Sequence, residues 1–136
     1  MKKTIITLTT ALLLLCAPAH AEETTGRVYW FKDGDSFMLD IRRGGRWVED
    51  ECRMLHYNTP EMKGKERPLG IVSRRKLMDL MAGRFVHLWW EKRDKYGRML
   101  CEIWLDEGTY INAAMRRWLD EDLRYEGAGK YDHLER

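Results

Sequence analysis

The alternation of apolar and polar residues along the chain predicts several short strands. Between Ser36 and Ile41, the side chains of Phe37, Leu39 and Ile41 fall on one face and the residues between them on the other. This two-residue period is that of a half-buried strand. Five segments have this alternation or are rich in β-branched and aromatic residues. The predicted strands are residues 27–31, 36–41, 47–55, 84–91 and 100–105, with a hairpin turn at Gly44-Gly45.

Two other segments have the spacing of amphipathic helices. Leu77, Leu80 and Met81 recur at positions i, i+3 and i+4, and Gly83 follows as a natural stop. A second stretch presents apolar residues such as Ile111 on one side at the same spacing. The predicted helices cover residues 69–82 and 110–123, with a short third helix at 131–136.

The predicted order is three strands, a helix, two strands and a helix. This is the sequence layout of a small five-stranded OB-fold barrel, an α+β and mainly β architecture with two to three helices. An open α+β sheet is the alternative, because the pattern alone does not show whether the first and last strands meet.

The first 21 residues are predicted to be a cleavable secretory signal. Lys2 and Lys3 precede an apolar stretch over residues 5–17, and Ala19-His20-Ala21 supplies small residues at the cleavage site. An uncleaved anchor is the alternative. Cleavage after Ala21 would leave residues 22–136 as one domain and place the protein in the periplasm or outside the cell, as a monomer with no stable membrane association.

Charge and composition limit the function classes. The 136-residue chain is 44% hydrophobic and 34% charged, which excludes a disordered protein. The predicted signal contains two of the 24 basic residues and none of the 22 acidic ones, so the overall charge of +2 becomes formally zero after cleavage. No general basic field remains to attract nucleic acid, and any such attraction must come from locally placed cations.

Three polar segments at predicted strand ends contain residues suited to phosphodiester chemistry. They are Asp33-Gly34-Asp35, Arg53 followed by Asn58-Thr59-Pro60-Glu61, and Asp94-Lys95-Tyr96-Gly97-Arg98. Each alone is also typical of an ordinary hairpin turn. Together they offer oxygens for a hard cation, a carboxylate base and two guanidinium groups for developing negative charge.

The same segments resemble the staphylococcal nuclease (thermonuclease) family. The family pattern is Asp-Gly-Asp with Thr or Ser, a strand ending in Arg, Asp-Thr-Pro-Glu, and then Asp-Lys or Arg-Tyr-Gly-Arg. The motifs occur here in that order, and the resemblance covers about residues 27–125. It implies a five-stranded OB barrel and a calcium-dependent nuclease that acts on DNA and RNA and leaves 3′-phosphate ends.

The resemblance also implies a role for individual positions. It assigns catalysis to Arg53, Glu61 and Arg98, ligation of one Ca²⁺ to Asp35, Asn58 and the backbone carbonyl of Thr59, and contacts with phosphate and nucleoside to Lys95, Tyr96 and Tyr125. Glu61 would orient or deprotonate a water molecule, and the arginines would stabilise the pentacoordinate phosphorus as bidentate donors.

Two features bear on this assignment. The family usually has Asp where this chain has Asn58, so one ligand charge is lost and other divalent ions become candidates. Cys52 and Cys101 remain after signal cleavage, and their spacing alone favours neither a disulfide nor two buried thiols. In the family's barrel the two strands are neighbours, and the resemblance therefore implies a disulfide.

Two other functions stay open from the sequence. One is a catalytically weak nucleic-acid-binding OB-fold protein with an impaired metal site, and the other is a small envelope protein that binds protein or sugar. A basic surface could track phosphates, although its helix part, Arg74, Arg75 and Lys76, could equally be a solvated face. Its residues are Lys63, Lys65, Arg67, Arg74, Arg75 and Lys76.

Overall fold

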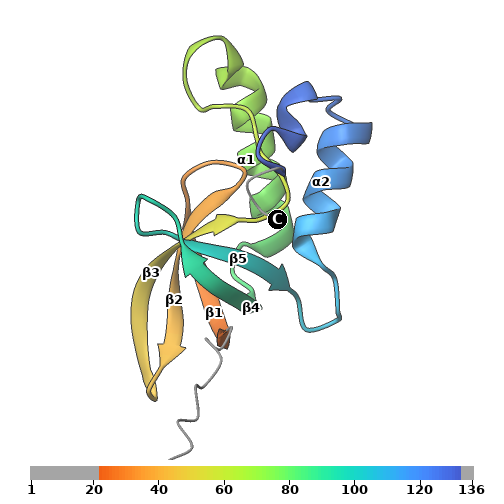
Figure 1. Ribbon diagram of the computed structural model, residues 1–136. Helices are drawn as coiled ribbons and strands as arrows, with labels where there is room; N and C mark the ends of the chain where they lie inside the picture. Colours follow the sequence, from red (N-terminus) through yellow and green to blue (C-terminus); the bar gives the residue numbers. More distant parts are fainter. Residues whose placement is uncertain (1–21, 133–136) are drawn as a thin grey trace, which may run out of the picture.

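The computed structural model describes residues 22–132 and shows a closed five-stranded barrel with two α-helices beside it (Figure 1). The predicted signal peptide and most of the predicted helix at 131–136 lie outside the described residues. The strands are β1 (Glu22–Phe31), β2 (Ser36–Arg43), β3 (Arg46–Met54), β4 (Phe85–Arg93) and β5 (Met99–Trp104). The helices are η1 (Gly64–Glu66), α1 (Arg67–Met81), α2 (Ile111–Glu121) and η2 (Glu126–Gly129), where η marks a 3₁₀-helix.

The strands are ordered β1-β2-β3-β5-β4 around the barrel, and β4 returns to pair with β1. The predicted barrel is therefore confirmed, and the open sheet is excluded. All pairs are antiparallel except β3 and β5, which pair in parallel over only Cys52–Met54 and Met99–Cys101. In the described chain this is the shortest of the five ladders, so the seam between β3 and β5 is the weakest part of the closure.

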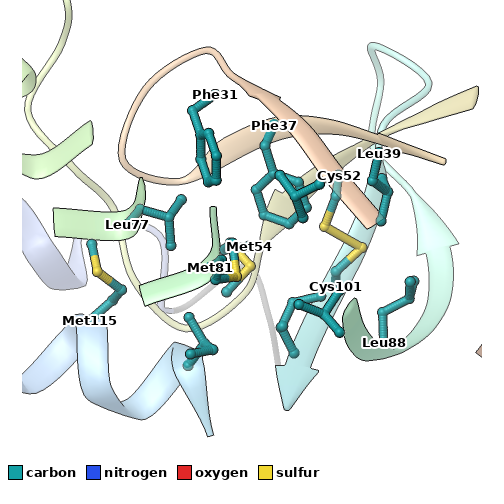
Figure 2. Close-up of a cluster of buried hydrophobic side chains, with 14 of the residues drawn as sticks. Phe31, Phe37, Leu39, Cys52, Met54, Leu77, Met81, Leu88, Cys101 and Met115 are labelled. Atoms are coloured by element: carbon teal, nitrogen blue, oxygen red, sulfur yellow. A yellow bond between two sulfur atoms is a disulfide. The ribbon is translucent and has the colours of Figure 1, made fainter. Parts of the chain in front are cut away.

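The barrel interior is filled by the alternating residues that the sequence pattern identified. Phe37, Leu39 and Ile41 of β2 are fully buried. They belong to the same buried cluster as Leu77 of α1 and Met115 of α2, so both helices contribute to one core (Figure 2). The β2–β3 hairpin extends away from these helices and turns through two glycines with positive φ, as a two-residue type I′ turn requires (Figure 1).

Both α-helices differ from the prediction by one or two residues at each end. α1 begins at Arg67 rather than residue 69, because Pro68 fits the first turn of a helix, where its missing N–H has no intrahelical acceptor. The polar tail after α2 contains η2, which has no apolar periodicity to reveal it. No helix within residues 22–132 is both long enough and apolar enough to cross a membrane.

Asn112 of α2 connects the helix to two strands. Its buried Oδ1 accepts from the backbone N of Ile103 at 2.8 Å, and its Nδ2 donates to the carbonyl oxygens of Leu55 and Cys101 at 2.9 Å. One side chain thus fixes the segment that leaves β3 against β5. That segment leads directly to the 58–61 motif.

Candidate active site at one end of the barrel

Asp35 lies at the centre of the polar residues at this end of the barrel. It follows β1 in the Asp33-Gly34-Asp35 loop and is only 5% exposed. Its Oδ2 accepts from both the backbone N and the Oγ1 of Thr59 at 3.0 Å, and its Oδ1 accepts from Ser36 Oγ at 3.0 Å. One buried carboxylate therefore connects the β1–β2 loop to the segment after β3.

Arg53, at the end of β3, joins this group. Its Nη2 lies 3.4 Å from Asp35 Oδ2 and 3.4 Å from Asn58 Oδ1. Its Nη1 donates to the carbonyl oxygens of Met54 and, at 3.0 Å, of Tyr57. The Arg53 side chain is 11% exposed, and acceptors on several sides hold its guanidinium group in one orientation.

Arg98 approaches from the turn between β4 and β5. Its Nε donates to Asp94 Oδ2 at 2.8 Å, its backbone N donates to Asp94 Oδ1 at 3.1 Å, and its Nη1 donates to Ser36 Oγ at 3.2 Å. Burial would raise the pKa of Asp94, but these bonds and the charge of Arg98 outweigh it and lower that pKa. Ser36 therefore contacts both Asp35 and Arg98, which brings the first and third sequence motifs together.

The loop that carries Glu61 lies directly on α1. A Cβ at Gly70 of α1 would be 2.4 Å from the Glu61 carbonyl oxygen, so only glycine permits this approach. Gly34 is similarly close: a Cβ there would be 2.8 Å from Ser73 Cβ on α1 and 2.8 Å from Thr59 Cγ2. Gly34 and Gly70 thus let the Asp33-Gly34-Asp35 loop and the loop that carries Glu61 both pack against α1.

Tyr125 lies near three carboxylates of the site, those of Glu66, Glu61 and Asp35. Its hydroxyl donates to Glu66 Oε1 at 3.2 Å. Burial, followed by the negative charges of Glu66, Glu61 and Asp35, raises the pKa of Tyr125 to about 12. The phenol therefore stays protonated at neutral pH. The nucleoside contact that the family resemblance implies for Tyr125 stays a prediction.

A pocket of about 490 Å³ opens beside the two arginines. Arg53, Lys95 and Arg98 line its cationic part, while Tyr96 and Tyr131 contribute aromatic rings. Tyr125 is absent from the described residues that line it, whereas Tyr131 is present. The tail of the sequence has no motif that marks Tyr131. Its aromatic side chain in an otherwise polar segment is the one available signal.

Tyr96 is 71% exposed, and two cationic side chains of the same turn lie close to its ring. Lys95 Nζ lies 5.0 Å and Arg98 Cζ 5.3 Å from its centroid. Such cation–π contacts hold a ring in place while leaving a face for a ligand. The structure therefore brings the predicted Lys95 and Tyr96 to the same pocket as the two arginines.

The predicted calcium ligands are hard oxygen donors, which suit a hard divalent cation. Asp35, Asn58 and Thr59 lie together through the bonds described above. Burial, followed by the adjacent charge of Asp35, raises the pKa of Asp33 to about 7. Among residues 22–132, however, no three His, Cys, Asp or Glu side chains converge as a metal-binding group. Asp35, Asn58 and Thr59 offer oxygen atoms of the type that such a cation prefers, and Asp35 supplies the one negative charge among them.

Two known proteins align with most of this chain. A protein of Escherichia coli O157:H7 is 32% identical and a protein of Escherichia coli is 31% identical, each over 105 residues. Both relatives are called uncharacterized endonucleases. The alignments cover 76% of this chain and 60% of each relative, so the chain spans about three fifths of the length of the curated relatives it matches. No protein-family model matches the chain.

Cys52 and Cys101 form a disulfide between β3 and β5, within the barrel core (Figure 2).

The predicted basic surface is less uniform than the sequence indicates. Lys63, Lys65 and Arg67 are exposed around η1, whereas Lys76 lies over the ring of Trp118 on α2, 5.9 Å from its centroid. Lys76 is therefore engaged with the neighbouring helix rather than continuing the surface of the loop.

Proposed function

We propose that this protein is an exported, calcium-dependent nuclease that hydrolyses phosphodiester bonds of DNA and RNA. The observation that carries the proposal is the convergence of Arg53 and Arg98 on the Asp35–Ser36 pair, at the barrel end where Glu61 also lies. The names of the two Escherichia coli relatives support a nuclease in general. The order of the three sequence motifs supports the thermonuclease type, and the N-terminal pattern supports export.

The two arginines are suited to hold a phosphodiester and stabilise the charge that develops on it. Each is fixed by acceptors before substrate binds, Arg53 by carbonyl oxygens and Asp35, and Arg98 by Asp94. Donors that are already oriented stabilise a transition state without reorganising. The planar guanidinium group also matches two phosphate oxygens at once, which a lysine ammonium does not.

Glu61 is the candidate general base. Its side chain is exposed beside the buried cluster, where it can reach a water molecule that attacks the phosphorus in line. A cation held by Asp35, Asn58 and the Thr59 carbonyl would supply positive charge to polarise a phosphoryl oxygen. Departure of the 5′-oxygen would leave the 3′-phosphate ends that the family resemblance implies.

The pocket beside the arginines suits a phosphorylated nucleoside. Arg53, Arg98 and Lys95 offer positive charge at one side, and Tyr96 and Tyr131 offer rings on which a base can stack. Stacking tolerates every base, which agrees with an enzyme that acts on DNA and RNA alike.

The second candidate function is a nucleic-acid-binding barrel with little catalysis. Asn58 favours it, because the amide replaces a charged ligand. An incubation of the protein with plasmid and single-stranded DNA, with calcium or with a chelator, separates the possibilities. Cleavage only in the presence of calcium supports the proposed nuclease, and cleavage with both calcium and chelator rejects its calcium requirement. Retarded but intact DNA supports the binding protein, and no effect on DNA argues against both.

A further inference from the structure

We propose that Glu66 is a positioning residue that holds the backbone of Glu61 in place for catalysis. The inference rests on the proposed function and extends it to a residue that no sequence motif includes. Glu66 occupies the N-cap of α1, yet its side chain makes no capping bond to that helix. Its Oε2 accepts instead from the backbone N of Glu61 at 2.9 Å, and its Oε1 accepts from Tyr125 Oη at 3.2 Å.

The bond to Glu66 completes the fixation of the Glu61 backbone. Gly70 of α1 supports the carbonyl side of Glu61 by direct contact, and Glu66 holds its N–H side. In the described structure, the side chains of residues 62–65 make no hydrogen bond or ion pair that would hold the loop independently. The Glu61 carboxylate is exposed, so its direction depends on how firmly this backbone is held.

Tyr125 fixes Glu66 from the opposite side. Its backbone N donates to the Leu119 carbonyl at 2.9 Å, which ties it to the end of α2, and its ring lies where a Cβ at Gly127 would be 2.5 Å away. A donor anchored in this way locks the rotamer of the Glu66 side chain. Two consecutive hydrogen bonds, from Tyr125 to Glu66 and from the Glu61 backbone to Glu66, thus connect the end of α2 to the candidate base.

Replacing Glu66 therefore affects turnover more than substrate binding. In Glu66→Ala we expect kcat for DNA cleavage to fall about 10- to 100-fold, with KM little changed, because misplacing a catalytic group by about 1 Å has effects of that order. Glu66→Gln should recover part of the loss, since its amide oxygen still accepts one of the two bonds. Glu121→Ala, at the exposed end of α2, is the matched control and should cleave like the wild type.

A double-mutant cycle distinguishes positioning from general stabilisation. If Glu66 acts through Glu61, Glu66→Ala causes no further loss of kcat in a Glu61→Gln background. Equal losses in both backgrounds, or unchanged kcat in folded Glu66→Ala, would overturn the proposal.

Amide hydrogen exchange tests the bond itself without any activity. The Glu61 N–H should exchange faster in Glu66→Ala than in the wild type, and equal exchange rates contradict the proposal. If the wild type does not cleave DNA, the proposed function and the catalytic role of Glu66 both fail. Faster exchange would then still show that the contact forms, so the two failures are distinguishable.

Discussion

The Cα atoms of Cys52 and Cys101 lie 6.0 Å apart, and a disulfide joins them across the seam between β3 and β5. Cys52 immediately precedes Arg53, and Cys101 lies three residues after Arg98. The covalent link therefore reinforces the shortest ladder of the barrel, close in sequence to both candidate catalytic arginines. Figure 2 shows the link among the buried side chains.

Removing this disulfide should destabilise the fold. For the Cys52→Ala/Cys101→Ala double variant we expect the free energy of unfolding to fall by about 2–4 kcal/mol, because the link restricts the unfolded chain between residues 49 positions apart. Denaturant unfolding measures this loss. A reductant should lower the midpoint of the wild type and leave the variant unchanged. A wild-type midpoint that does not respond to reductant would show that the link contributes nothing.

Gly70→Ala should destabilise the protein, although helix propensity predicts the opposite. Alanine in the middle of a helix is favoured over glycine by about 1 kcal/mol. Here its Cβ would be 2.4 Å from the Glu61 carbonyl oxygen, and that overlap should cost about 1–3 kcal/mol and displace the Glu61 loop. Thermal unfolding and DNA cleavage should both decline. Val72→Ala, at an exposed position of α1, is the control. A Gly70→Ala protein more stable than the wild type would refute the close contact.

Asp50 should make the stability sensitive to acid. Burial acts to raise its pKa, but the Arg93 guanidinium, bonded to it at 2.7 and 2.8 Å, helps to lower that pKa below the ordinary value of 3.8. The ion pair links β3 to β4, and its contribution is complete above about pH 4 and lost as the pH falls further. Asp50→Asn should lose about 1.5–3 kcal/mol at pH 7 and depend less on pH below 4. Denaturant unfolding measured at several pH values tests this. Parallel pH profiles for wild type and variant would contradict it, and Asp79→Asn on α1 is the control.

Asn58→Asp should tighten calcium binding. The substitution restores a second carboxylate to a donor set in which Asp35 is the one full charge, and calcium affinity rises with the charge of its ligands. We expect a gain of about tenfold or more in a calorimetric titration. An affinity no better than that of the wild type would count against this ligand set.

The sequence predicted those parts of the molecule that depend on local pattern. The alternation in β2, the glycine turn and the apolar faces of the helices lead directly to the observed elements. The motif residues Asp35, Arg53 and Arg98 come together because each lies at a strand end, and these strand ends meet at one end of a closed barrel.

Features that depend on the path of the chain in space were not predictable. The reach of Arg93 to Asp50 joins two distant segments without a local signal. Tyr131 lies at the pocket, next to a residue of the tail that is held by α2. Arg116 Nη1 of α2 donates to Asp132 Oδ1 at 3.1 Å and to Oδ2 at 3.0 Å.

The central claim is that the arginines at this end of the barrel stabilise phosphodiester cleavage, and the turnover of Arg98→Ala tests it most directly. The variant should fold, since the barrel core does not include this side chain, and DNA cleavage with calcium should slow about 10²- to 10³-fold. Arg84→Ala removes an exposed ion pair with Glu107 and should cleave at the wild-type rate. A folded Arg98→Ala protein that cleaves DNA as fast as the wild type would contradict the account.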